Sequence, residues 1–110
     1  MSEEAYRFDE GKIDFTYLDV SALEGLCKVL EYGDKKYTIN GVSGRDNWRK
    51  GMPYMKVLRS LLRHTFAIMR GETTDPESGL QHIDHIGCNW MFLSHYMKNR
   101  EDLNDLPKQE

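Results

Sequence analysis

Histidine and carboxylate side chains, which can transfer protons, bind metal ions or contact phosphate, lie close together in the sequence over residues 72–85 of this 110-residue chain. His82 and His85 are three residues apart, and Asn89 and Tyr96 follow at steps of four and seven. At that spacing all four side chains share one face of a helix. Two imidazoles one turn apart can bind one metal ion or approach one phosphate group. The alternative, hydrogen bonding between helices only, is equally consistent with the spacing.

Three carboxylates, Glu72, Asp75 and Glu77, come shortly before these histidines. Hard oxygen ligands of this kind suit Mg²⁺ or Mn²⁺ bound to phosphates, so we expect these three residues to be the metal ligands. The structural alternatives are helix capping by Asp75 and a favourable position of Glu77 in a first helical turn. Neither accounts for Glu72. The candidate catalytic residues are therefore Glu72, Asp75, His82 and His85.

Positive charge is concentrated in the middle of the chain. Residues 35–70 contain nine of the 15 Lys and Arg residues and one acid, Asp46, although the net charge is −3. A basic segment in an acidic protein predicts binding of a small phosphorylated ligand such as a nucleotide. It argues against duplex nucleic acid, which needs a broadly basic face. The candidate substrate-binding residues are Lys36, Tyr37, Asn47, Trp48, Arg49, Lys50, Arg63, His64 and Asn89.

Within this set, Trp48 can stack on a base, Asn47 can read the base edge, and the cations can hold phosphate. Two alternatives stay open: Trp48 anchors its loop in the core, and His64, on an apolar helix face, is a core residue. For Lys56 and Arg59 we expect solvated positions on a helix surface. The sequence has no Walker A and no G-x-G-x-x-G motif, which argues against the common nucleotide-binding folds.

Three helices are predicted to position these residues. Apolar residues recur at helical spacing in three segments, each with signals for the start or the end of a helix. The first helix is predicted to begin at Ser21, the second to span about 53–70 and the third about 80–99. Ser21 and Glu24 form a capping box at the first helix. The predicted apolar face of the third helix, beside its histidine face, consists of Ile83, Ile86, Trp90, Leu93 and Met97.

The remaining segments are expected to be irregular. We predict an extended, partly strand-like arm over residues 1–20, a loop over 38–51 and a charged, frayed tail over 100–110. The whole chain is therefore predicted to be one all-α nucleotide-binding domain, a small bundle of three helices that forms a homo-oligomer.

Membrane and export signals are not found in the sequence. No apolar run approaches the roughly 20 residues of a membrane span, and the N-terminus is acidic. Cys27 and Cys88 lack metal-type spacing, so we expect two buried, reduced thiols. We therefore predict a cytoplasmic protein without membrane contact.

An ordered series of short motifs runs through most of the chain. It comprises RFDEGK at 7–12, YGDKKY at 32–37, Asn47-Trp48, Arg63-His64, Gly71-Glu72, DPESG at 75–79 and H-x-x-H-x-x-x-N at 82–89. In this order the motifs resemble the phage-type dATP/dGTP diphosphohydrolase N-terminal domain family. The resemblance implies cleavage of purine deoxynucleoside triphosphates to monophosphate and pyrophosphate with a divalent metal. It also implies a phage origin, and a relationship to the all-α MazG-like pyrophosphohydrolases, which are helical oligomers.

The carboxylate pattern departs from that of the MazG-like enzymes, which hold metals with E-x-x-E on one helix and E-x-x-D on another. Here Glu24 and Glu31 are seven residues apart, and Glu72 and Asp75 have E-x-x-D spacing in a predicted loop. The metal ligands of the MazG-like enzymes therefore cannot be assigned to residues of this chain from the spacing of its carboxylates. The alternative function is a phage protein that binds a nucleotide without cleaving it and so counteracts nucleotide-based host defence.

Overall fold

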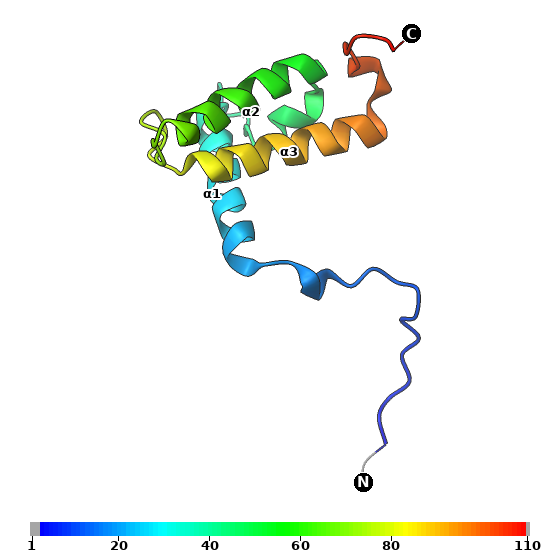
Figure 1. The fold of residues 1–110 in the computed structure, drawn as a ribbon. Helices are drawn as coiled ribbons and strands as arrows, with labels where there is room; N and C mark the ends of the chain where they lie inside the picture. The colour runs from blue at the N-terminus through cyan, green and yellow to red at the C-terminus, as the bar shows by residue number, and fades with distance from the viewer. Residues whose placement is uncertain (1–2, 110) are drawn as a thin grey trace.

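The computed structural model describes residues 3–109, which form three α-helices joined by loops and short 3₁₀ turns. The helices are α1 (Val20–Lys36), α2 (Tyr54–Met69) and α3 (His82–Asn99) (Figure 1). The 3₁₀ turns are η1 (Phe15–Tyr17), η2 (Asn47–Lys50) and η3 (Glu101–Leu103). Within the described residues the only β pairings are isolated bridges, Ile39 with Val42 and Thr74 with Gln81, so the all-α prediction is confirmed.

The centre of the fold is an antiparallel hairpin of α2 and α3. The two helices lie side by side, and α1 crosses them and packs chiefly on α3 (Figure 1). The N-terminal half of α1 leaves the hairpin and leads back to the arm before residue 20. None of the helices in the described range is long and apolar enough to cross a membrane.

The open end of the hairpin is held by two buried tyrosines. Tyr54 and Tyr96 are 1% and 0% exposed, and the Tyr54 hydroxyl lies 3.1 Å from the carbonyl oxygens of Tyr96 and Arg100. The Tyr96 hydroxyl donates to the carbonyl oxygen of Trp48. These bonds satisfy the phenol groups that packing removes from water. The partly buried apolar side chains around this core are Trp48, Met52, Phe92, Leu93, Leu103 and Leu106.

The C-terminal tail was predicted to fray, and this is wrong. Arg100 donates to the carbonyl oxygens of Arg49 and Lys50, and Leu103 and Leu106 pack on the tyrosine core. Asp105 accepts a hydrogen bond of 2.9 Å from the backbone N–H of Met55, in the first turn of α2. The tail therefore caps the start of α2, a contact between residues 50 apart that no local pattern reveals.

The predicted apolar face of α3 is also wrong for its main members. Ile83, Trp90 and Met97 are 55%, 62% and 54% exposed, whereas His82 and Tyr96 on the predicted polar face are buried. Tyr96 thus belongs to the core and not to a ligand-binding face. The polar side chains can point inward because each finds a hydrogen-bond partner there, and no buried side-chain N or O of residues 3–109 lacks one.

At the N-terminus the structure corrects three expectations. Asp19, not Ser21, caps α1: its carboxylate accepts from the N–H of Ala22, and Ser21 lies inside the helix. The strand-like segment is the 3₁₀ turn η1, capped by Asp14. The described residues of the arm, 3–19, are all exposed. Of the two cysteines, Cys27 is exposed and Cys88 is buried.

The buried phenol of Tyr54 provides a test of this packing. Tyr54→Phe removes the hydroxyl that joins α2 to the end of α3, and each such bond contributes about 0.5–1.5 kcal/mol. We expect Tm to fall by roughly 4–8 °C per kcal/mol lost, measured by calorimetry. The control Tyr17→Phe alters a side chain that is 90% exposed and is expected to leave Tm unchanged. An unchanged Tm for Tyr54→Phe would contradict the docked C-terminal segment.

Candidate functional site

A cleft of about 590 Å³ lies between the three helices and the loops that join them. Its volume falls within the range typical of small-molecule sites. Six cationic side chains line it, and they come from α1, α2 and the loop before η2: Lys36, Arg45, Lys56, Arg59, Arg63 and Arg70. The helices thus gather much of the basic segment of the sequence around one cavity.

Most of the predicted site residues line this cleft. Those that do are Lys36, Tyr37, Asn47, Trp48, Arg63, His64, Glu72, Asp75, Glu77, His82, His85 and Asn89. Arg49 and Lys50 do not, because η2 turns them outward, where Arg49 pairs with Asp46 at 3.3 Å. Lys56 and Arg59, expected on a solvated helix surface, are exposed and also line the cleft.

The loop between α2 and α3 holds the carboxylates in place. The N–H of Glu72 donates to the carbonyl oxygen of Ala67 at 2.9 Å, and that of His82 donates to Thr73 at 2.9 Å. Gly79 has a φ of +73°, which a residue with a side chain rarely adopts. The structural alternative for Asp75, capping of the third helix, is wrong, since its carboxylate accepts from Glu77 N–H and the Ser78 hydroxyl within the loop.

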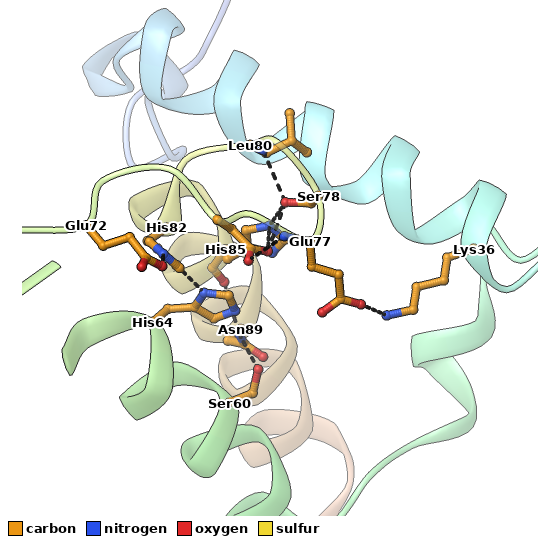
Figure 2. Close-up of polar contacts among 11 residues, drawn as sticks. Lys36, Ser60, His64, Glu72, Glu77, Ser78, Leu80, His82, His85 and Asn89 are labelled. Carbon is orange, nitrogen blue, oxygen red and sulfur yellow. Dashed lines mark hydrogen bonds and ion pairs between the residues drawn. The ribbon is translucent and has the colours of Figure 1, made fainter. Parts of the chain in front are cut away.

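One chain of hydrogen bonds links this loop to both helices (Figure 2). Glu72 Oε1 lies 2.8 Å from His82 Nε2, and His82 Nδ1 lies 2.8 Å from His64 Nδ1. A carboxylate can only accept, so a neutral His82 donates from Nε2 and accepts at Nδ1. His64 must then donate from its own Nδ1, which leaves a lone pair on its Nε2.

A second imidazole–carboxylate contact lies beside the first. His85 Nε2 is 2.7 Å from the Ser78 hydroxyl oxygen and 3.3 Å from Asp75 Oδ2. The His85 and His64 rings stack with centroids 4.5 Å apart and planes within 3° of each other. Two imidazoles therefore lie face to face at the cleft: His85, which contacts Asp75 directly, and His64, which is linked to Glu72 through His82.

Burial sets the charge state of these groups. It lowers the pKa of His64, helped by the neighbouring imidazoles, and it lowers the pKa of His85 although the Asp75 carboxylate opposes it. Burial alone would raise the pKa of Asp75, but hydrogen bonds from Glu77 and Ser78 and the adjacent His85 lower it. Near neutral pH the two stacked imidazoles are therefore neutral and able to accept a proton.

The three expected metal ligands do not form one preformed site. Glu72 binds His82, Asp75 binds Ser78 and His85, and Glu77 forms an ion pair of 3.0 Å with Lys36. Among residues 3–109 no group of three His, Cys, Asp or Glu side chains is placed to hold a metal ion. The residues present thus do not fit a preformed metal centre.

A second E-x-x-D spacing, Glu31 to Asp34 on α1, went unnoticed in the sequence. Asp34 lines the cleft, but its carboxylate accepts from Ser43 at 2.9 Å, and Glu31 is exposed and is not among the cleft-lining residues. This pair therefore adds no second ligand to the carboxylates of the loop.

Trp48 contributes to the wall of the cleft mainly as an anchor. Its ring stacks on Phe92 with centroids 4.9 Å apart, and the Arg49 guanidinium lies 4.4 Å from the ring centroid. His95 meets it edge-on at 5.2 Å. Trp48 thus lies where the alternative hypothesis put it, as an anchor of its loop in the core. A base could stack on its ring only by displacing one of these partners.

Comparison with known proteins identifies the family of the chain. Residues 2–106 match the family described as "dATP/dGTP diphosphohydrolase, N-terminal", and the chain belongs to that family. A dATP/dGTP diphosphohydrolase of Salmonella phage PMBT28 is 30% identical over 99 residues, which cover 90% of this chain and 32% of the relative. The chain thus spans about a third of the length of that relative. No solved structure matches the chain.

The lowered pKa values of His64 and His85 predict how stability depends on pH. Below the ordinary imidazole pKa of about 6.5, the unfolded chain binds more protons at these positions than the folded chain. The free energy of unfolding therefore decreases as pH falls from about 7.5 to about 5.5. Asp75 contributes in the same direction, because its pKa is lowered as well, but only near and below the ordinary carboxyl pKa of 3.8.

Calorimetric Tm values across this range test the prediction. We expect the double variant His64→Gln/His85→Gln to have a flatter dependence of Tm on pH than the unmodified chain. Parallel curves for the two proteins would contradict the assignment of neutral, buried imidazoles.

Proposed function

We propose that the cleft binds a purine deoxynucleoside triphosphate and that the α–β phosphoanhydride is hydrolysed there, giving the monophosphate and pyrophosphate. The observation that carries the proposal is that one cleft combines a row of cations with two stacked neutral imidazoles, one beside Asp75 and one linked through His82 to Glu72. Cations neutralise the triphosphate and the charge on the leaving pyrophosphate, and an imidazole can take the proton of an attacking water. Membership of the family supports the choice of substrate.

Arg63 is the cation best placed to act next to the imidazoles. It precedes His64 on α2 and lines the cleft, as do Arg59 and Arg70 from the same helix. Lys36 approaches from α1, and its hydrogen bond to Glu77 raises its pKa and keeps it charged. A triphosphate in the cleft would thus meet positive charge from both sides.

A second candidate function is nucleotide binding without turnover, as in a phage protein that sequesters a nucleotide. The dispersal of Glu72, Asp75 and Glu77 onto separate partners favours it, because a phosphate-cleaving site built on metal needs convergent ligands. Dependence on Mg²⁺ or Mn²⁺ is accordingly a separate proposal. Loss of turnover on chelation, restored by either ion, is the result that would support it.

We also propose that the chain forms a homo-oligomer and acts in the host cytoplasm. Ile83, Trp90 and Met97 recur every seven residues, so they form one exposed apolar stripe on α3. Exposed apolar stripes of this kind are typical of helix–helix interfaces. Light scattering of the chain in solution decides between an oligomer and a monomer.

The enzymatic proposal predicts pyrophosphate release from dATP or dGTP, measured by separating the products with and without Mn²⁺. Arg63→Ala is expected to weaken binding by about 1.5–3 kcal/mol, the value of a charge-assisted hydrogen bond, with little change in Tm. The matched control Lys28→Ala removes an exposed cation of α1 outside the cleft and is expected to bind normally.

The outcomes separate the candidate functions. Tight binding without pyrophosphate release from any purine nucleotide would favour the sequestering protein. Equal affinities of the Arg63→Ala and Lys28→Ala variants would contradict the cleft as the phosphate site.

A further inference from the structure

We infer that His64 Nε2 is the atom that accepts the proton from the attacking water, and that His82 and Glu72 are positioning residues that hold His64 in the tautomer this step needs. The inference deepens the proposed function and rests on it. His64, predicted as a substrate contact, thereby becomes a catalytic residue, and Glu72 and His82, predicted as catalytic residues, become positioning residues.

The lone pair on His64 Nε2 is accessible. Among residues 3–109 no group forms a hydrogen bond with His64 Nε2, whose ring is bound only through Nδ1. His64 is partly buried, and no buried side-chain N or O in that range is without a partner. His64 Nε2 must therefore face the open space of the cleft, which His64 lines.

The hydrogen bonds behind that lone pair have a fixed direction. Glu72 fixes the proton of a neutral His82 on Nε2, and His82 Nδ1 then fixes the proton of His64 on Nδ1. When His64 Nε2 gains a proton, its positive charge is stabilised through His82 by the Glu72 carboxylate. His82 itself is 4% exposed and has no free ring nitrogen, so it can orient His64 but cannot contact substrate.

His64 differs from its stacked neighbour His85. The side chain of His85 is 12% exposed, and its Nε2 shares its proton between Ser78 and Asp75. Asp75 already accepts from the Glu77 N–H and the Ser78 hydroxyl, whereas within the described chain Glu72 accepts from His82 alone. Glu72 therefore has a single hydrogen-bond donor where Asp75 has several, so more of its charge is available to the chain of bonds that runs through His82 to His64.

The chemistry balances without a further reactant. A bond forms between the water oxygen and the α-phosphorus, the bond from that phosphorus to the α–β bridging oxygen breaks, and pyrophosphate leaves with the bonding electrons. The water proton passes to His64 Nε2 and is later released to solvent. The charged and titratable groups around His64 are His82 and His85 of α3, Glu72 and Asp75 of the loop, and Arg63 of α2; from α1, Tyr32 reaches only His85, edge-on.

The kinetic test uses the full chain with dGTP, following kcat and KM across pH. His64→Gln is expected to lower kcat by roughly 100- to 10,000-fold with little change in KM, as for loss of a general base. Glu72→Gln keeps a hydrogen-bond acceptor for His82 but removes its charge. It is expected to lower kcat less and to move the acid limb of the kcat profile to lower pH, because His64 becomes less basic. A merely structural role for Glu72 would not move that limb.

Two further variants keep the inference falsifiable if side-chain truncation disturbs folding. His82→Asn retains an acceptor near the position of Nδ1 and is expected to keep more activity than His82→Ala at equal Tm. The control His95→Gln changes the histidine that does not line the cleft and is expected to leave kcat unchanged. Nitrogen chemical shifts of the free protein are expected to place the neutral-state proton of His64 on Nδ1 and that of His82 on Nε2.

Three results would overturn the inference. They are retained kcat in His64→Gln, an unmoved acid limb in Glu72→Gln, and a His64 proton on Nε2. Absence of pyrophosphate release by the unmodified chain would instead overturn the proposed function, and the proton acceptor with it. Turnover that survives His64→Gln but is lost in His85→Gln would transfer the role to His85 and leave the proposed function standing.

Discussion

The constraint on which the site depends is the burial of His82, whose side chain lies among the hydrogen-bonding groups of the cleft with 4% of its surface exposed. A buried imidazole must find a partner for each ring nitrogen, since an unsatisfied polar group costs about 1–3 kcal/mol. Glu72 from the loop supplies one partner and His64 from α2 supplies the other. The same two bonds therefore close the loop end of the helical hairpin and orient the imidazole that faces the cleft.

Much of the fold could be predicted because it depends on local signals. The periodicity of apolar residues and the breaks at Pro53 and Gly71 placed the start of α1 and both ends of α2 and α3 within about two residues of the observed ends. The phase of α3 could not be predicted, since its inner face carries His82 and Tyr96, which become acceptable inside only when distant partners satisfy them. The docked tail was missed for the same reason, because Asp105 meets Met55 only in three dimensions.

The sequence indicated which residues line the cleft better than it indicated how they are paired. The basic segment and the two histidine motifs line one cleft, as their charge and spacing indicated. Their pairing could not be foreseen: Glu72 and His64 are separate motifs in the sequence, and only the antiparallel packing of α2 and α3 brings both to His82. Local turns also determine which cations reach the cleft. The turn η2 directs Arg49 and Lys50 away from it, whereas Lys56 and Arg59 line it.

The most direct test of the account is a titration of the free protein with the α,β-methylene analogue of dGTP, which has no cleavable α–β bridge. The measurement is the imidazole nitrogen and proton chemical shifts of the four histidines. The account predicts saturable shifts of His64, His82 and His85 with one common affinity, and none of His95, which lies outside the cleft-lining residues. Saturable binding that moves His95 alone, or that leaves His64 unmoved, would contradict the cleft as the nucleotide site.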